Sequence, residues 1–207
     1  MKDLSSKNHW ENIYQTKELS EVSWFQPTPE TSLSFFSEFK VPLTAKIIDI
    51  GGGDSFLVDH LLELGYQDIT VLDISSSSLE KAKERLGNKA KKVKWIVANA
   101  ANFNPSEQYD FWHDRAAFHF LTNQSEIANY LNTAQRNVKP NGILTIGTFS
   151  KDGPKKCSGI EIKQYSETTL QEVFNPFFEK ISCSTVNHKT PFDTVQNFVF
   201  CSFKRLG

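Results

Sequence analysis

Apolar and polar positions alternate in two different rhythms between residues 46 and 147. Short apolar runs have the length of buried strands, and the stretches between them carry apolar residues at helical spacing. The apolar runs cover residues 46–50, 69–72, 93–97, 109–113 and 143–147. The helical stretches cover residues 56–64, 79–86 and 127–138, and Lys139-Pro140-Asn141-Gly142 predicts a turn. This alternation predicts an α/β fold, a parallel sheet with helices on both faces.

The two ends of the chain follow other patterns. Residues 8–17 and 29–39 have helical spacing and flank an extended aromatic segment at residues 22–27. Towards the C-terminus, a short helical stretch at residues 170–174 precedes two β-rich segments. These segments cover residues 178–186 and 197–203, and the connection between them is short and lacks a helical pattern. Such a connection predicts an antiparallel strand pair.

A glycine-rich loop, Gly51-Gly52-Gly53, follows the first predicted strand and precedes a helix. Glycines let the backbone approach a ligand closely, and a helix N-terminus presents free N–H groups. Asp73 closes the second strand 20 residues after Gly53, where a carboxylate can accept hydrogen bonds from two ribose hydroxyls. Together these features predict a nucleotide-sized binding site. The alternative is a structural βα turn that contains convenient glycines.

The residues around this loop separate the possible ligands. Phe56 stands where a dinucleotide fingerprint needs its third glycine, and no Gly-Lys-Ser/Thr ending marks a P-loop. A nicotinamide-dependent oxidoreductase is therefore disfavoured. Asp49 and the spacing Gly51-x-Gly53-x-Ser55 resemble instead the first motif of class I S-adenosylmethionine-dependent methyltransferases, with Ser55 in place of the usual third glycine.

The chain is similar to one group of that family from about residue 8 to its C-terminus, the group that includes citrate synthase lysine methyltransferase and its bacterial relatives. The segments that carry this resemblance are Trp10-Glu11-x-Ile13-Tyr14, Glu21-Val22-Ser23-Trp24-Phe25-Gln26, Ile48-Asp49-Ile50-Gly51-Gly52-Gly53, Tyr109-Asp110-Phe111-Trp112-His113-Asp114-Arg115-Ala116 and Lys156-Cys157-Ser158-Gly159. The resemblance implies a Rossmann-like, seven-stranded, mostly parallel sheet with an antiparallel C-terminal hairpin. We expect a single domain over residues 1–207, with a lid segment at residues 1–40 and a core at residues 41–207.

The resemblance also assigns residues to S-adenosyl-L-methionine as the cofactor. From its methionine end to its adenine, the expected contacts are Asp49, Gly51, Gly53, Asp73, Ile74, Asn99 and Ala100. At Asn99 an amide oxygen replaces the usual acid and can still accept a hydrogen bond from the adenine amino group. Trp24 and Gln26 are expected to form a lid in which an aromatic ring stacks on the sulfonium cation. The alternative for Trp24 is a plug at the sheet edge.

Residues near the end of the fourth strand are the candidates for catalysis, namely Asp114, Arg115 and His119. Asp114 would also interact with the cofactor's ammonium group or sulfonium. Arg115 would bind a substrate carboxylate or form a surface ion pair with Asp114. His119 would act as a base or pack as a structural histidine. We expect His113 to pack in the same way and His188, between the last two strands, to be exposed.

Composition narrows the classes of partner. The net charge is −1, which favours neither nucleic acid nor an anionic membrane. Three cysteines without a CxxC pair argue against a disulfide scaffold or a zinc site, and histidine spacing predicts no metal. The first ten residues match neither a signal peptide nor a transit peptide. We therefore expect a cytoplasmic protein.

The reaction implied by the resemblance is in-line transfer of a methyl group to a protein lysine or a small polar metabolite. Methylation of nucleobase amino groups is disfavoured, because no Asn/Asp-Pro-Pro-Tyr motif follows the fourth strand. The alternative is a non-catalytic regulatory domain that binds S-adenosylmethionine or S-adenosylhomocysteine. An intact lid and acceptor pocket would argue against that alternative.

Overall fold

The computed structural model describes residues 2–207, with side chains from residue 5 onward. The N-terminal part consists of α1 (Lys2–Thr16), a 3₁₀ turn (Leu19–Glu21) and α2 (Glu30–Glu38). The remaining helices are α3 (Leu57–Glu63), α4 (Ser76–Leu86), α5 (Gln124–Asn137) and α6 (Glu167–Phe174). The strands of the main sheet are β1 (Lys46–Ile50), β2 (Asp68–Asp73), β3 (Val93–Val97), β4 (Tyr109–Arg115), β5 (Val138–Phe149), β8 (Phe178–Lys189) and β9 (Val195–Arg205). A small separate ribbon pairs β6 (Lys156–Cys157) with β7 (Ile160–Glu161).

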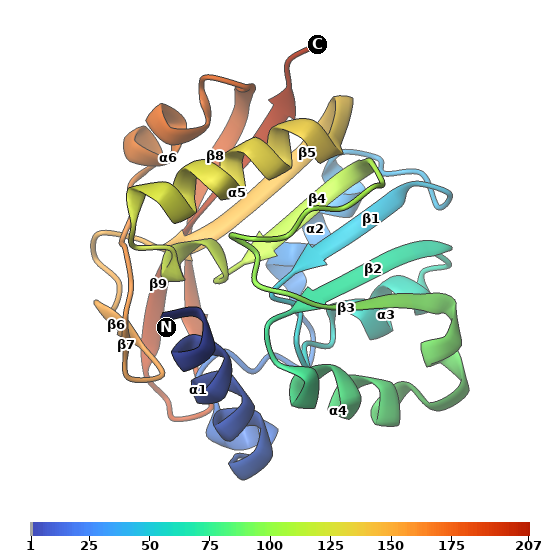
Figure 1. The fold of residues 1–207 in the computed structure, drawn as a ribbon, viewed down its shortest axis with the longest axis vertical. Coiled ribbons are helices and arrows are strands. Elements are labelled where there is room, and N and C mark those ends of the chain that lie inside the picture. Colours follow the sequence, from blue (N-terminus) through green and yellow to red (C-terminus); the bar gives the residue numbers. More distant parts are fainter. Residues whose placement is uncertain (1) are drawn as a thin grey trace.

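The seven strands of the sheet lie in the order β3-β2-β1-β4-β5-β9-β8 (Figure 1). The first five are parallel, whereas β9 runs antiparallel to both of its neighbours. The seven-stranded sheet and its antiparallel C-terminal hairpin are therefore confirmed. Strand order reverses between β1 and β4, and open α/β sheets bind ligands beyond the carboxyl ends of the strands at such a point.

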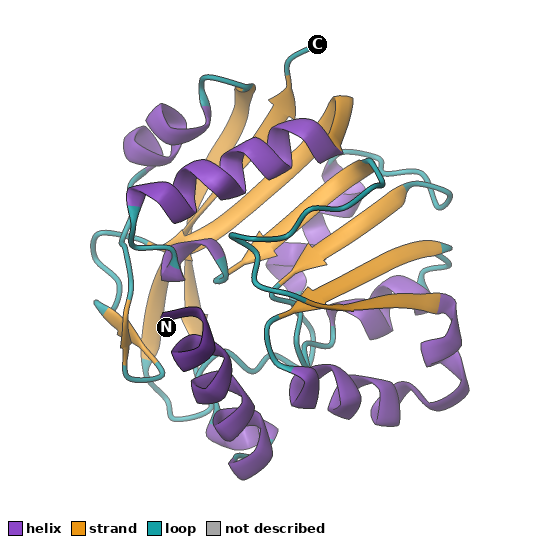
Figure 2. Cartoon of the chain, viewed as in Figure 1, coloured by secondary structure: helices purple, strands orange, loops and turns teal. Residues whose placement is uncertain are grey.

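Helices cover both faces of the sheet, as Figures 1 and 2 show. On one face α2, α3 and α4 bury apolar side chains such as Phe36, Leu61 and Leu79 in one core cluster. On the other face α5 and α6 bury Ile127 and Leu170 in a second cluster. Among residues 2–207, none of the helices combines the length and the apolar character required to cross a lipid bilayer.

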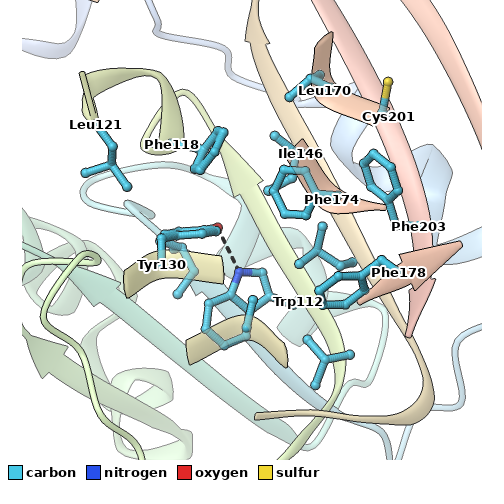
Figure 3. Packing of buried hydrophobic residues seen from close by; sticks show 14 of the residues in the cluster. Trp112, Phe118, Leu121, Tyr130, Ile146, Leu170, Phe174, Phe178, Cys201 and Phe203 are labelled. Carbon is cyan, nitrogen blue, oxygen red and sulfur yellow. Dashed lines mark hydrogen bonds between the residues drawn. The ribbon is translucent and has the colours of Figure 1, made fainter. Parts of the chain in front are cut away.

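The second core cluster contains a buried hydrogen bond between Trp112 and Tyr130 (Figure 3), and it continues to Asp114 of β4. The indole Nε1 of Trp112 donates to the Tyr130 hydroxyl at 2.9 Å, and that hydroxyl donates to Asp114 at 2.8 Å. All three residues are fully buried. Because each of these three buried polar groups has a partner, they fix the position of β4 against α5 without an unsatisfied atom.

The turn expected at residues 139–142 is wrong. These residues lie inside β5, and pairing with β4 jumps from Tyr109–Val138 to Phe111–Ile143. Asn141 accommodates the resulting bulge with a φ of +64°, a conformation that asparagine tolerates better than most residues. A Pro-Asn-Gly run has the same chemistry in a bulge as in a turn, so the local sequence does not separate the two.

The expectation that the cysteines form no disulfide is also wrong. Cys183 of β8 and Cys201 of β9 form a disulfide, and the two residues stand directly opposite each other in the strand register. Cys157 is free and buried. The separation of 18 residues between Cys183 and Cys201 did not predict their pairing. The two positions meet only once the hairpin has formed in its particular register.

Candidate active site

A cavity opens beyond the carboxyl ends of β1, β2 and β4, at the reversal of strand order. Its walls come from the glycine loop, the residues that follow β2, β3 and β4, and the N-terminal segment with α1. Most of the residues predicted to bind the cofactor line it, namely Trp24, Asp49, Gly51, Asp73, Ile74, Asn99 and Ala100. Arg115 lines it as well, whereas Gly53, Asp114 and His119 do not. The structure therefore brings together residues from across the first 115 positions of the chain.

The glycine loop has no space for side chains at its two key positions. Gly51 and Gly53 have φ values of +68° and +48°, which favour glycine. A Cβ on Gly51 would lie 2.6 Å from the Cβ of Ala117, and a Cβ on Gly53 would lie 2.8 Å from the Tyr14 hydroxyl. Close approach by the lid and by the turn after β4 thus requires glycine at both positions. Gly53 is not itself a lining residue, but it lies against Tyr14 and Asp73, which are.

A charged cluster holds this loop against α4. Arg85 forms an ion pair with Asp54 and a second with Asp59 at 2.9 Å, and its guanidinium lies 4.2 Å from the centre of the Phe56 ring. Asp54 is buried, and its burial raises its pKa against the opposing effect of Arg85. Because a buried carboxylate needs a partner, Arg85 fixes the position of the loop.

Asp73 presents a buried carboxylate at the floor of the cavity. It is 6% exposed, and its Oδ1 accepts a hydrogen bond of 2.8 Å from the Ser75 N–H. Burial raises its pKa to about 7. A pair of hydroxyl donors would satisfy the carboxylate and favour its ionised form. Asp73 therefore has the placement and the chemistry expected of a ribose-binding acid.

Asp49 is joined to His113 and through it to α2. Nδ1 of His113 lies 2.7 Å from Oδ1 of Asp49, and its Nε2 lies 2.9 Å from the Ser32 hydroxyl. All three residues are buried. Both ring nitrogens of His113 are occupied by hydrogen bonds, one to each neighbour. His113 is thus a packed, hydrogen-bonded histidine, as expected, and it orients Asp49 at the cavity.

Arg115 points into the cavity with part of its guanidinium unpaired. Its Nη1 donates to the Trp24 carbonyl at 3.2 Å, and the group lies 5.2 Å from the centre of the Phe198 ring. Its Nη2 is buried and has no hydrogen-bond partner among the described residues. Burial lowers its pKa to about 10. The alternative of a surface ion pair with Asp114 is therefore wrong.

The structure does not support a catalytic or cofactor-binding position for Asp114. Its carboxylate accepts hydrogen bonds from the N–H groups of Ala117 at 2.9 Å and Phe118 at 3.1 Å, and from Tyr130 at 2.8 Å. Burial raises its pKa to about 6. These bonds hold the turn at Ala116, whose φ is +70°. Asp114 therefore supports the turn beside the cavity, because one of its oxygens is bonded to backbone N–H groups and the other to Tyr130.

His119 is likewise outside the cavity. Its Nδ1 accepts from the Phe149 N–H at 3.3 Å, and its ring packs against Phe120 and Phe149. Burial lowers its pKa to about 3, so the imidazole is neutral at physiological pH. Of the two alternatives for His119, the structure favours the packed histidine over the base.

The residues expected to contact adenine lie together on one wall. Ile74 follows β2, and Asn99 and Ala100 follow β3. The Asn99 Oδ1 accepts a hydrogen bond of 2.9 Å from the Ala101 N–H. This bond orients the amide, and a carbonyl oxygen retains a second lone pair.

The aromatic wall of the cavity is larger than the segment around Trp24, which we expected to form a lid. Trp10 and Tyr14 of α1 line the cavity with Trp24, and their ring centres lie 5.6 and 6.2 Å from that of Trp24. Phe120 closes the group, with its centre 5.1 Å from that of Trp10. Gln26 also lines the cavity. The helical spacing of Trp10 and Tyr14 was a usable signal, but it predicted packing and not a wall of the site.

His188 corrects another expectation. It lies in β8 and is 5% exposed. Its Nε2 lies 2.7 Å from the Ser23 carbonyl oxygen and donates to it, because a carbonyl oxygen can only accept. Burial lowers its pKa. Together with the bond from Arg115 to Trp24, this contact attaches the lid segment to the core. A sequence pattern could not place His188 there, since the two residues are 165 positions apart.

Comparison with known proteins finds similarity to methyltransferases. Residues 47–142 match a family described as a methyltransferase domain. The chain is 27% identical over 107 residues to malonyl-[acyl-carrier protein] O-methyltransferase 2 of Ilyobacter polytropus, a match that covers 51% of this chain and 40% of that protein. It is 23% identical over 164 residues to human EEF1A lysine methyltransferase 2, covering 69% of this chain and 67% of that protein.

The fold is shared with solved structures over nearly the whole chain. The N-methyltransferase NodS from Bradyrhizobium japonicum, in complex with S-adenosylhomocysteine, superposes with a TM-score of 0.71 at 13% identity. The superposition covers 96% of this chain and 98% of NodS. The chain spans less than half of the length of the Ilyobacter relative. The sequence match across the glycine loop and Asp73 and the shared fold together support a class I S-adenosylmethionine-dependent methyltransferase.

Proposed function

We propose that this chain binds S-adenosylmethionine in the cavity and transfers its methyl group to a protein lysine or a small polar metabolite. When bound, the cofactor supplies an electrophilic methyl group on a sulfonium. The observation that carries the proposal is the buried Asp73 carboxylate beside a glycine loop that has no space for side chains. This combination fits a ribose and the chain of atoms that leads from it.

The residues that line the cavity would contact successive parts of the cofactor. Asp73 would accept hydrogen bonds from the ribose hydroxyls, and Ile74 with Asn99 would contact the adenine. Asp49, held by His113 at 2.7 Å, and the backbone at Gly51 would face the methionine end. These placements follow the resemblance to the methyltransferase family, and each of these residues lines the cavity.

The aromatic lid would act on the reacting centre. Rings of Trp10, Tyr14 and Trp24 line the cavity together, and aromatic faces attract a sulfonium cation. Closure of the lid would also exclude water and bring the acceptor into line with the methyl group. In the transfer, a lone pair of the acceptor forms the new bond to carbon as the carbon–sulfur bond breaks. The pair from that bond stays on sulfur, and the acceptor loses its proton to solvent.

Two observations bear on the acceptor. The unpaired Nη2 of Arg115 favours an acceptor that carries a carboxylate, because guanidinium groups bind carboxylates through paired N–H donors. The similarity to EEF1A lysine methyltransferase 2 favours a protein lysine. A regulatory domain without catalysis is the rival, and the open cavity beneath the lid favours an enzyme over it.

The acceptor class is tested by incubating the protein with methyl-labelled S-adenosylmethionine and a cell extract separated into proteins and small molecules. Label in methyllysine after protein hydrolysis would assign a protein lysine, and label in the small-molecule pool would assign a metabolite. An Asp73→Asn variant serves as the negative control for both pools. Tight cofactor binding without transfer to either pool would contradict the proposal and favour the regulatory alternative.

A further inference from the structure

Glu11 of α1 makes an unusually complete contact with the N-terminus of α4. Its Oε1 accepts from the N–H and the hydroxyl of Ser76, at 2.7 and 2.8 Å. Its Oε2 accepts from the Ser77 N–H and the Ser75 hydroxyl, both at 3.0 Å. One carboxylate thus satisfies free N–H groups of a helix to which it does not belong, at the end where negative charge is favoured.

The contact is strong enough to perturb the carboxyl group itself. Burial opposes its ionisation, but the hydrogen bonds from Ser77 and Ser76 outweigh burial and lower the Glu11 pKa to about 2. Two weaker contacts extend the same seam. Gln15 donates to the Ser77 hydroxyl at 3.1 Å, and Lys81 of α4 donates to the Lys17 carbonyl at 3.0 Å. Glu11 therefore anchors the junction of α1 with α4.

The same helix forms a wall of the cavity. α1 supplies Trp10 and Tyr14 to the lining, and the Tyr14 hydroxyl approaches Gly53 so closely that a Cβ there would lie 2.8 Å from it. Glu11 stands between these two residues in the sequence. A movement of α1 away from α4 that opens this wall breaks the hydrogen bonds of Glu11.

A single residue links this junction to the floor of the cavity. Ser75 donates its N–H to Asp73 at 2.8 Å and its hydroxyl to Glu11 at 3.0 Å. The carboxylate that anchors α1 and the carboxylate proposed to hold the ribose thus share Ser75. The position of α1 and the geometry of the ribose site are therefore coupled.

We propose that Glu11 is a positioning residue that clamps α1 over the bound cofactor and so sets how long the cofactor stays bound. The proposal rests on cofactor binding in this cavity, as proposed above. Loss of the clamp lets α1 detach from α4 more often, which opens the wall formed by Trp10 and Tyr14. Dissociation then becomes faster, while the contacts within the cavity remain in place.

The test is the dissociation rate of S-adenosylhomocysteine, followed in a stopped-flow instrument by intrinsic tryptophan fluorescence, to which Trp10 and Trp24 contribute from the cavity wall. For Glu11→Gln we expect a rate about tenfold faster than that of the wild type, the size of one charge-assisted hydrogen bond. Ser76→Ala, at an exposed position of α4, removes the hydroxyl that donates to Glu11. It removes a single donor, so we expect about a threefold increase.

The matched control is Glu30→Gln, which removes an exposed acid from the first turn of α2, outside the cavity lining. We expect its dissociation rate to equal that of the wild type. A merely structural role for Glu11 would lower the melting temperature of the free protein and leave the dissociation rate of its folded fraction unchanged. That result, or an equal acceleration in Glu30→Gln, would overturn the proposal.

A double-mutant cycle with Glu11→Gln and Ser76→Ala completes the test. If the two side chains act through their mutual hydrogen bond, the effects on the dissociation rate are less than multiplicative. Independent effects would contradict a clamp. Failure of the wild type to bind S-adenosylhomocysteine would overturn the proposed function instead, so the two failures are distinguishable.

Discussion

At the scale of single residues, the site holds one carboxylate whose charge is disfavoured and one whose charge is favoured. Asp73 has its pKa raised to about 7 by burial, whereas Glu11, a few ångströms away through Ser75, is held near 2 by hydrogen bonds. Desolvation without enough donors explains the first, and a full set of donors explains the second. A ligand that donates hydrogen bonds to Asp73 would supply what the folded protein lacks there.

This imbalance makes a prediction for the stability of the free protein. The folded state binds the Asp73 proton more tightly than the unfolded state, so stability falls as pH rises through the carboxyl's ordinary range and levels off above pH 7. Asp73→Asn removes that cost. We expect the ligand-free variant to be more stable than the wild type by about 2 kcal/mol at pH 8, and by much less at pH 5. Denaturant titrations at both pH values measure this difference, and a variant less stable than the wild type at pH 8 would contradict it.

At the scale of elements, the site depends on contacts between segments that are distant in the sequence. The glycine loop is held to α4 through Arg85, and the lid is attached to β8 through His188 and to β4 through Arg115. The sequence pattern was sufficient to predict the main-sheet strands, the glycine loop and the aromatic segment, because each has a distinctive local periodicity or composition. The pattern was insufficient to predict the roles of Asp114, His119 and His188, because those roles depend on which backbone groups lie next to each side chain after folding.

The attachment of the glycine loop predicts a specific loss of stability. Arg85→Met keeps an unbranched apolar stem but removes the guanidinium, which leaves Asp54 buried without its charged partner. We expect the free energy of unfolding to fall by about 3 kcal/mol, and cofactor affinity to fall with it. Lys83→Met, on the same helix with a partly exposed ion pair to Glu80, is the control and is expected to cost less than 1 kcal/mol. Equal losses in the two variants, measured by denaturant unfolding, would contradict this role of Arg85.

At the scale of the whole molecule, the parallel half of the sheet forms the floor of the site and the C-terminal hairpin supports its lid. The hairpin lies at the far edge of the sheet from β3, and its two strands are joined by the disulfide between Cys183 and Cys201. This bond closes a loop that contains the connection between β8 and β9 and lies in the same hairpin as His188. The fold class was predictable because an alternation of strands and helices permits few topologies. The pairing of the cysteines could not be predicted, because it depends on the register between β8 and β9.

The disulfide predicts that stability depends on redox conditions. For a loop of this length the loss of chain entropy in the unfolded state corresponds to about 3 kcal/mol. We expect a reductant to lower the melting temperature of the wild type by several degrees and to leave a Cys183→Ser variant unchanged. Cys157→Ser, at the free cysteine, is expected to keep the response to reductant. Three reactive thiols in the unfolded, unreduced protein would show that the bond does not form.

The most direct measurement of the central claim is a calorimetric titration of the protein with S-adenosylhomocysteine, beside Asp73→Ala and a control, Asp152→Ala, at an exposed turn outside the cavity. We predict saturable binding at one site per chain for the wild type and the control. For Asp73→Ala we predict a loss of affinity of at least about a hundredfold, since two hydrogen bonds to a charged group are removed. The absence of binding by the folded wild type, or equal affinity of the Asp73→Ala variant, would contradict the assignment of this cavity to the cofactor.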